Sequence, residues 1–102
     1  MIIPHKTFET AEKFQIFIDE EKSWVYARIY EAIHESFNAK KDIAHIMEAK
    51  IEDTMSLMTI DSGRDEWLES LELAMVWYVS TENYEKCAKI RDLIESIENT
   101  EL

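Results

Sequence analysis

The chain contains a single glycine, Gly63, and a single proline, Pro4, and this scarcity restricts its fold more than any other feature. All-β domains need many tight turns, and those turns favour Gly, Asn or Pro at positions with special backbone dihedrals. Long helices joined by few connections need much less of either residue. The sequence therefore predicts a mainly α fold, a small helical bundle of about four helices that ends in an antiparallel helical hairpin.

Length and hydrophobic content predict one domain. A chain of 102 residues, of which 46% are hydrophobic, can bury a single core of modest size. Three Trp, four Tyr and four Phe residues argue against disorder, because disordered chains are poor in aromatic residues. We therefore expect residues 1–102 to form one helical domain. A small core with surplus aromatic residues is also compatible with a homo-oligomer.

The formal net charge is −11, from 22 acidic and 11 basic residues. Clusters of Lys and Arg bind phosphate backbones and anionic membranes, and the only adjacent basic pair is Lys40–Lys41. Direct contact with nucleic acid or with a membrane is therefore not expected. The sequence also has no apolar stretch of membrane-spanning length, and residues 1–6 lack a signal-peptide pattern. Cys87, the single cysteine, has no internal disulfide partner, which suits a cytoplasmic location.

Apolar residues recur at helical spacing through the N-terminal part of the chain. Thr7 is a candidate N-cap, because its hydroxyl can accept from a free amide of the first helical turn. The residues that follow at helical spacing are Phe8, Ala11, Phe14, Ile18, Val25, Ile29, Ile33 and Phe37. They predict either one long helix over residues 7–38 or two helices with a joint near Ser23.

The segment 43–60 permits two interpretations. Its apolar residues step by about one helical turn, at Ile43, Met47, Ile51, Met55 and Met58. The run 55–60 can equally form a short strand that pairs with residues 46–51. The lack of a turn glycine favours the helix, and the alternative is an α+β fold with a short hairpin within 43–60.

The final third of the chain begins after a cluster of turn-forming residues at 61–65. Two amphipathic stretches follow it, and a short connection at 80–83 separates them. They predict an antiparallel helical hairpin over residues 66–98. The first stretch is apolar on two sides, which is typical of a central helix that packs against more than one neighbour.

Residues 75–94 of this hairpin resemble the UVR motif. The match consists of the nine-residue step from Met75 to the aromatic Tyr84 and of the pattern Glu-x-x-Ala-x-x-Arg-Asp-x-Ile over residues 85–94. The UVR motif is a helical hairpin of the UvrB and UvrC excision-nuclease subunits and of adaptors and ATPases in bacterial protease systems. The chain is also similar to small uncharacterised proteins of bacteria and their phages that end in such a hairpin.

The resemblance implies a role in protein–protein contacts, because the UVR hairpin pairs with another hairpin or with a partner domain. Carried over to this chain, the packing residues are Tyr84, Ala88, Ile90 and Ile94, and Arg91 with Asp92 is the polar pair. Trp77 departs from the motif, since it is bulky where the family tends to have small or polar residues, and we include it among the expected partner-binding residues. The predicted function is a small acidic protein-binding module, an adaptor or inhibitor with no enzymatic activity and no cofactor.

Two other functions are compatible with the composition. An acidic protein can mimic nucleic acid and block a nucleic-acid-binding protein, although the acidic residues are spread along the whole chain. A carboxylate-bridged metal enzyme is the second alternative, because Glu31 and His34 have the i, i+3 spacing of such sites, as do His45 and Glu48. Chance pairs are expected among so many acidic residues, and we assign no metal ligands. The sequence contains no zinc pattern, catalytic triad or glycine-rich phosphate loop.

Overall fold

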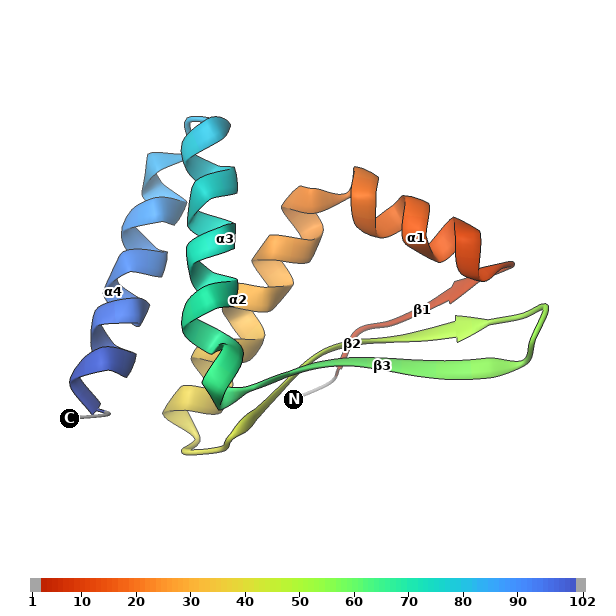
Figure 1. The fold of residues 1–102 in the computed structure, drawn as a ribbon, viewed down its shortest axis with the longest axis horizontal. Coiled ribbons are helices and arrows are strands. Elements are labelled where there is room, and N and C mark those ends of the chain that lie inside the picture. Colours follow the sequence, from red (N-terminus) through yellow and green to blue (C-terminus); the bar gives the residue numbers. More distant parts are fainter. Residues whose placement is uncertain (1–2, 101–102) are drawn as a thin grey trace.

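The computed structural model describes residues 3–100 and has an α+β fold, so the prediction of a mainly α bundle is wrong. The elements in chain order are β1 (His5–Phe8), α1 (Ala11–Glu20), α2 (Lys22–Asn38), β2 (Ile43–Ile51), β3 (Ser56–Gly63), α3 (Trp67–Ser80) and α4 (Tyr84–Thr100), with a 3-10 turn at Arg64–Glu66. The sheet has the order β1-β2-β3, with β1 parallel and β3 antiparallel to β2. Figure 1 shows α2, α3 and α4 gathered at one end of the molecule, while the sheet extends away from them below α1.

The segment 43–63 forms a long β-hairpin, which is neither a helix nor the short hairpin within 43–60. Steps of four residues keep one face of a strand as well as one face of a helix, because strand side chains alternate. A register shift between His45 and Met47 then brings both Ile46 and Met47 into the core. Met55 has a φ of 52° and takes the left-handed position that a glycine usually occupies in a turn.

Side chains of α2 complete the hydrogen bonding of β2. The strand β1 pairs only with the second half of β2, so the first half has no strand neighbour on that side. Arg28 donates from Nε to the carbonyl of Ile46 (3.0 Å) and from Nη2 to that of His45 (3.1 Å). The Ser36 hydroxyl donates to the carbonyl of Ile43 (3.1 Å). Without these bonds, the three backbone carbonyls would lie inside the protein with no hydrogen-bond partner.

The N-terminal helical stretch is divided in two, as one of the two interpretations of residues 7–38 proposes, and the break lies at Glu21, two residues before Ser23. Thr7 lies within β1, and the N-cap of α1 is Thr10, whose side chain accepts from the Lys13 amide. The break lets α1 return over β1, where the Phe8 ring lies 5.1 Å from the ring of Phe14. The two helices together form the crossover that a parallel pair of strands requires.

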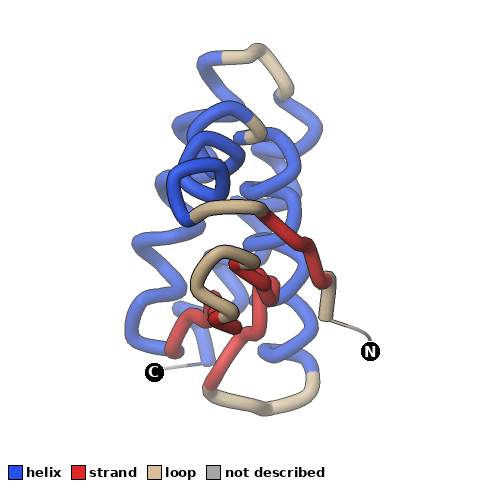
Figure 2. The backbone as a smooth tube through the Cα atoms, turned by 90° about the vertical axis from the view of Figure 1, so that its right-hand side faces the viewer, coloured by secondary structure: helices blue, strands red, loops and turns tan. Residues whose placement is uncertain are grey.

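The core lies between one face of the sheet and the helices. Its buried apolar residues are Phe14, Ala32, Ile33, Ala44, Ile46, Met47, Ala49, Ile51, Trp67, Leu71, Ala74, Tyr78, Ile90, Leu93 and Ile97. Figure 2 looks at the molecule from the tip of the β2–β3 hairpin and shows helix on the upper side of the strands. On the opposite face, His5, Thr7, His45 and Lys50 are exposed, and we call this the open face of the sheet.

The helices α3 and α4 occupy the range for which the sequence predicts a hairpin. Residues 61–63 of the expected turn cluster belong to β3 instead, and the 3-10 turn follows them. The buried indole of Trp67 donates from Nε1 to the Ser62 carbonyl (2.9 Å) and so joins α3 to the end of β3. Between the helices, Glu82 has a φ of 59°, and the Asn83 side chain accepts from the Lys86 amide (3.3 Å). The connection is therefore tight although it contains no glycine.

Burial raises the pKa of Tyr78, and the negative charge of Glu31 raises it further. The folded state thus holds the phenol proton more tightly than the unfolded state does. This stabilisation is fully present below the unfolded pKa of about 10 and is lost as the pH rises through the higher folded value. We expect the free energy of unfolding to fall in this alkaline range, and Tyr78→Phe to reduce the fall. Urea denaturation at stepped pH measures both, and an identical fall in the variant and the parent contradicts the prediction.

Candidate protein-binding site

Four of the five predicted partner-binding residues lie on α4. Tyr84, Ala88 and Arg91 are spaced by four and three residues, which places them on one side of the helix. Arg91 Nη2 lies 3.8 Å from Asp92 Oδ1, and Tyr84, Arg91 and Asp92 are all exposed. The opposite side of α4 supplies the buried residues Ile90, Leu93 and Ile97. The four residues therefore form a mostly polar, outward-facing stripe.

The fifth predicted residue, Trp77, is separated from this stripe. Its ring stacks on Tyr26 of α2, with ring centroids 6.2 Å apart, so Trp77 lies on the α2 side of α3. The α4 side of α3 is marked by Cys87, whose Sγ lies 3.8 Å from the Met75 carbonyl oxygen. Trp77 is half-buried and packs against its own domain. The structure therefore does not bring Trp77 together with the other four residues.

The outer face of α3 carries exposed apolar side chains that the sequence reasoning did not assign to a site. Leu73, Val76 and Val79 are spaced by three residues and are 55%, 67% and 51% exposed. We call these three residues the α3 strip. The opposite side of α3 is buried through Trp67, Leu71, Ala74 and Tyr78. Exposed apolar side chains that line up on one face of a helix often mark a surface that a partner covers, and nothing among residues 3–100 covers these three.

The charges on α3 are of one sign. Glu69 and Glu72 are its only charged residues, and both are exposed like the α3 strip itself. In contrast, α4 carries both signs, with Lys86, Lys89 and Arg91 among its acidic residues. The α3 strip is therefore an apolar surface with a negative border. The sequence signal for it was the second apolar side of this helix, which we expected to face a neighbour within the domain.

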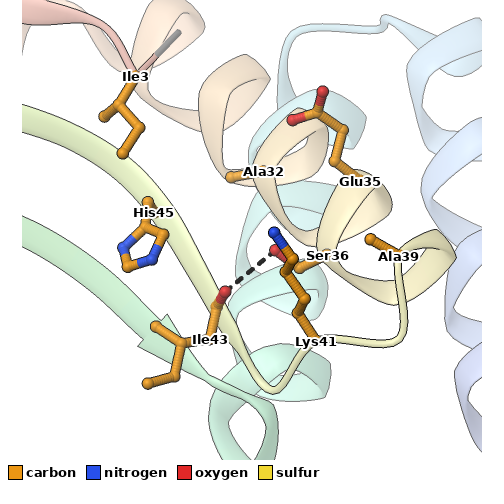
Figure 3. A pocket seen from close by; sticks show the side chains of 8 residues that line it. All are labelled: Ile3, Ala32, Glu35, Ser36, Ala39, Lys41, Ile43 and His45. Carbon is orange, nitrogen blue, oxygen red and sulfur yellow. Dashed lines mark hydrogen bonds between the residues drawn. The ribbon is translucent and has the colours of Figure 1, made fainter. Parts of the chain in front are cut away.

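Two hollows lie beside α2. One, of about 330 Å³, lies next to the first half of β2 and is lined by Ile3, Ala32, Glu35, Ser36, Ala39, Lys41, Ile43 and His45 (Figure 3). The dashed line in Figure 3 marks the hydrogen bond that the Ser36 hydroxyl donates to the Ile43 carbonyl. The other, of about 190 Å³, separates α2 from α4 and is lined by Tyr30, His34, Phe37, Asn38, Lys89, Asp92, Leu93 and Ser96. Neither lining contains a nucleophile oriented by a base, so neither has the geometry of a covalent catalytic site.

The two metal-ligand pairs considered from the sequence lie on different elements and have other partners. On α2, Glu31 Oε2 accepts from Arg28 Nη1 (3.1 Å), and the His34 ring stacks on Tyr30 with centroids 5.6 Å apart. The carboxylate of Glu31 is thus occupied by a guanidinium. This first pair is part of the surface packing of α2.

The second pair lies on the open face of the sheet. His45 Nδ1 lies 2.8 Å from Asp61 Oδ1, and Glu48 Oε2 lies 3.5 Å from His5 Nδ1. These two contacts link neighbouring strands across the sheet. Among residues 3–100, no three or more His, Cys, Asp or Glu side chains are grouped so that they could hold a metal ion. The metal-enzyme alternative therefore has no donor cluster in this part of the chain.

Within residues 3–100, no helix combines the length and the apolar character needed to cross a bilayer. Comparison of the chain with protein-family models, with curated proteins and with solved structures found no match.

Proposed function

We propose that this protein is a small protein-binding module, an adaptor or inhibitor, and that it docks on its partner through the α3 strip. The observation that carries the proposal is the exposure of Leu73, Val76 and Val79 in a row on a helix whose other sides are packed. Complete burial of a fully exposed side chain of this kind contributes about 1.5–3 kcal/mol, and between half and two-thirds of each of the three remains for a partner to cover. A partner that covers all three therefore gains part of the free energy of a specific complex.

The charges indicate the chemistry of the partner. Glu69 and Glu72 border the strip, and the chain carries a formal net charge of −11. A partner with an apolar patch and a border of Lys and Arg residues complements this surface, and the opposite charges also accelerate association. A module of this kind acts by occupying the partner's surface or by bringing it to a third protein.

The resemblance of residues 75–94 to the UVR motif supports a docking role for the same hairpin. In the proposed complex, the α3 strip supplies the apolar centre. The stripe of Tyr84, Ala88, Arg91 and Asp92 on α4 supplies a polar border. We therefore expect substitutions in the strip to weaken binding more than Arg91→Glu or Tyr84→Ala does.

We expect Val76→Glu to weaken binding at least about tenfold, because it places an unpaired carboxylate in an apolar contact. A photo-crosslinking amino acid at position 76 identifies the partner in the native host, and titration with the purified partner then gives the dissociation constant. Ala11→Glu is the matched control, since it adds the same charge at an exposed position on α1. Capture that fails at position 76, or equal affinities for Val76→Glu and Ala11→Glu with unchanged circular dichroism, argues against the proposal.

A further inference from the structure

The outer edge of β3 is free within the part of the chain that the structure describes. The strand covers Ser56–Gly63 and pairs only with β2. Natural edge strands are usually guarded against further pairing by Lys, Pro or a bulge. The strand β3 contains no Lys and no Pro, and Asp61 is its only charged residue. Its backbone groups are therefore available to another extended segment.

The helices bury the side chains of β2 that face them but leave Met58 of β3 partly exposed on the same face. Met58 lies directly opposite Ala49 in the register and faces the same side of the sheet. Ala49 is fully buried, whereas Met58 is 43% exposed. On the open face, Leu57 is also exposed, as is Met55 at the hairpin tip. A strand added beside β3 would cover apolar surface on both faces as well as bond to the backbone.

Acidic residues stand at both ends of this edge. Glu52 and Asp53 lie in the turn before β3, and Asp65 and Glu66 follow the strand; all four are exposed. An incoming segment with positive charges at its ends and apolar residues between them complements this arrangement.

A second copy of the chain is a poorer match for the same edge than a basic segment. In an antiparallel pair centred on Thr59, Met58 lies opposite the Ile60 of the other copy, which gives an apolar match. Each copy carries a formal net charge of −11, however, and like charges on two associating molecules repel. The net charge therefore favours a basic partner over a copy of this acidic chain.

We propose that the β3 edge binds an extended segment of a partner protein by strand addition, and that this segment has alternating apolar residues with Lys or Arg at its ends. The surface is separate from the α3 strip, which is presented by a helix. Binding adds a fourth strand to the sheet in the order β1-β2-β3-partner. Backbone bonds supply part of the affinity, and the terminal charges of the segment supply selectivity.

The test uses a synthetic peptide of about ten residues in which Val alternates with Thr and Lys stands at both ends. We expect the peptide to slow amide hydrogen exchange within residues 56–62 and to bind more weakly as salt is added. A peptide with Glu at both ends, and one whose backbone amides are methylated along one edge, should each bind at least about tenfold more weakly. Equal binding of the three peptides, or slowed exchange confined to α3 or α4, overturns the proposal.

Variants of the protein separate this surface from others. Met58→Lys introduces a guarding charge at the edge and should weaken the Lys-ended peptide at least about tenfold. His5→Lys is its control, because His5 is exposed on β1 at the other edge of the sheet and lies beside Glu48, with which a lysine can pair. Val76→Glu should bind the peptide like the parent, so the peptide result is independent of the α3 strip. A dimeric mass for the protein alone, with slow exchange in β3 that Met58→Lys abolishes, assigns the edge to a second copy and overturns the proposal.

Discussion

Arg28→Met is expected to lower the free energy of unfolding by about 3–5 kcal/mol. Arg28 is buried, and its guanidinium donates to the carbonyls of Ile46 and His45 and to Glu31. Methionine preserves much of the apolar stem but none of the donors, so both carbonyls beside the β-bulge lose their partner. Small domains are stable by only about 5–15 kcal/mol, so the variant should unfold at a clearly lower urea concentration than the parent. Circular dichroism monitors this unfolding.

Two further variants show whether the donors are responsible. Arg28→Lys keeps the charge but has one ammonium group in place of the planar fork, so its loss should be intermediate. Ser36→Ala removes the single bond to the Ile43 carbonyl and should cost about 1 kcal/mol. If Arg28→Met unfolds at the same urea concentration as the parent, the carbonyls of β2 do not depend on α2.

Trp67→Ala is expected to cost about 3–5 kcal/mol, the usual range for truncating a fully buried aromatic residue. The side chain fills the junction of α3 with the sheet, and its Nε1 donates to the Ser62 carbonyl. The Arg64 guanidinium also lies over the ring, 5.6 Å from its centroid. The variant should lose its near-ultraviolet dichroism at a lower temperature than the parent, because the C-terminal hairpin is no longer fixed to the strand before it.

Ser62→Ala is the control for this junction. It removes a buried hydroxyl that has no hydrogen-bond partner among residues 3–100, and it leaves the backbone carbonyl in place for Trp67. We expect a neutral or slightly stabilising effect. A loss from Ser62→Ala as large as that from Trp67→Ala would show that the junction depends on the hydroxyl rather than on the indole.

The helices could be predicted because each repeats its apolar residues over several turns. The strands could not, because the apolar steps of four residues in 43–55 fit a strand as well as a helix. The bulge at Ile46 interrupts the alternation of buried and exposed residues that would have identified a strand. Met55 occupies the left-handed turn position that is typical of a glycine. For β1 no local pattern exists, since its pairing depends on residues that follow two helices later.

The proposed docking surface was only partly predictable for a related reason. Spacing within α4 is local, so the sequence could group Tyr84, Ala88 and Arg91 on one side of a helix. Whether an apolar side chain is covered depends on the neighbours that the fold supplies. Leu71 and Leu73 are the same residue type on the same helix, and both belong to apolar sides of it. Yet Leu71 is buried and Leu73 is exposed. Only the arrangement of α2 and α4 around α3 distinguishes them.

The parallel pairing of β1 with β2 sets an order of assembly during synthesis. As the chain leaves the ribosome, β1 emerges first but has no partner until residues 48–51 have followed it. The β2–β3 and α3–α4 hairpins can each close as soon as they are made, because their partners are adjacent in the sequence. The strand β1 thus waits through two helices for its partner, and a slip of one residue in that pairing would turn the Phe8 ring from the core to water.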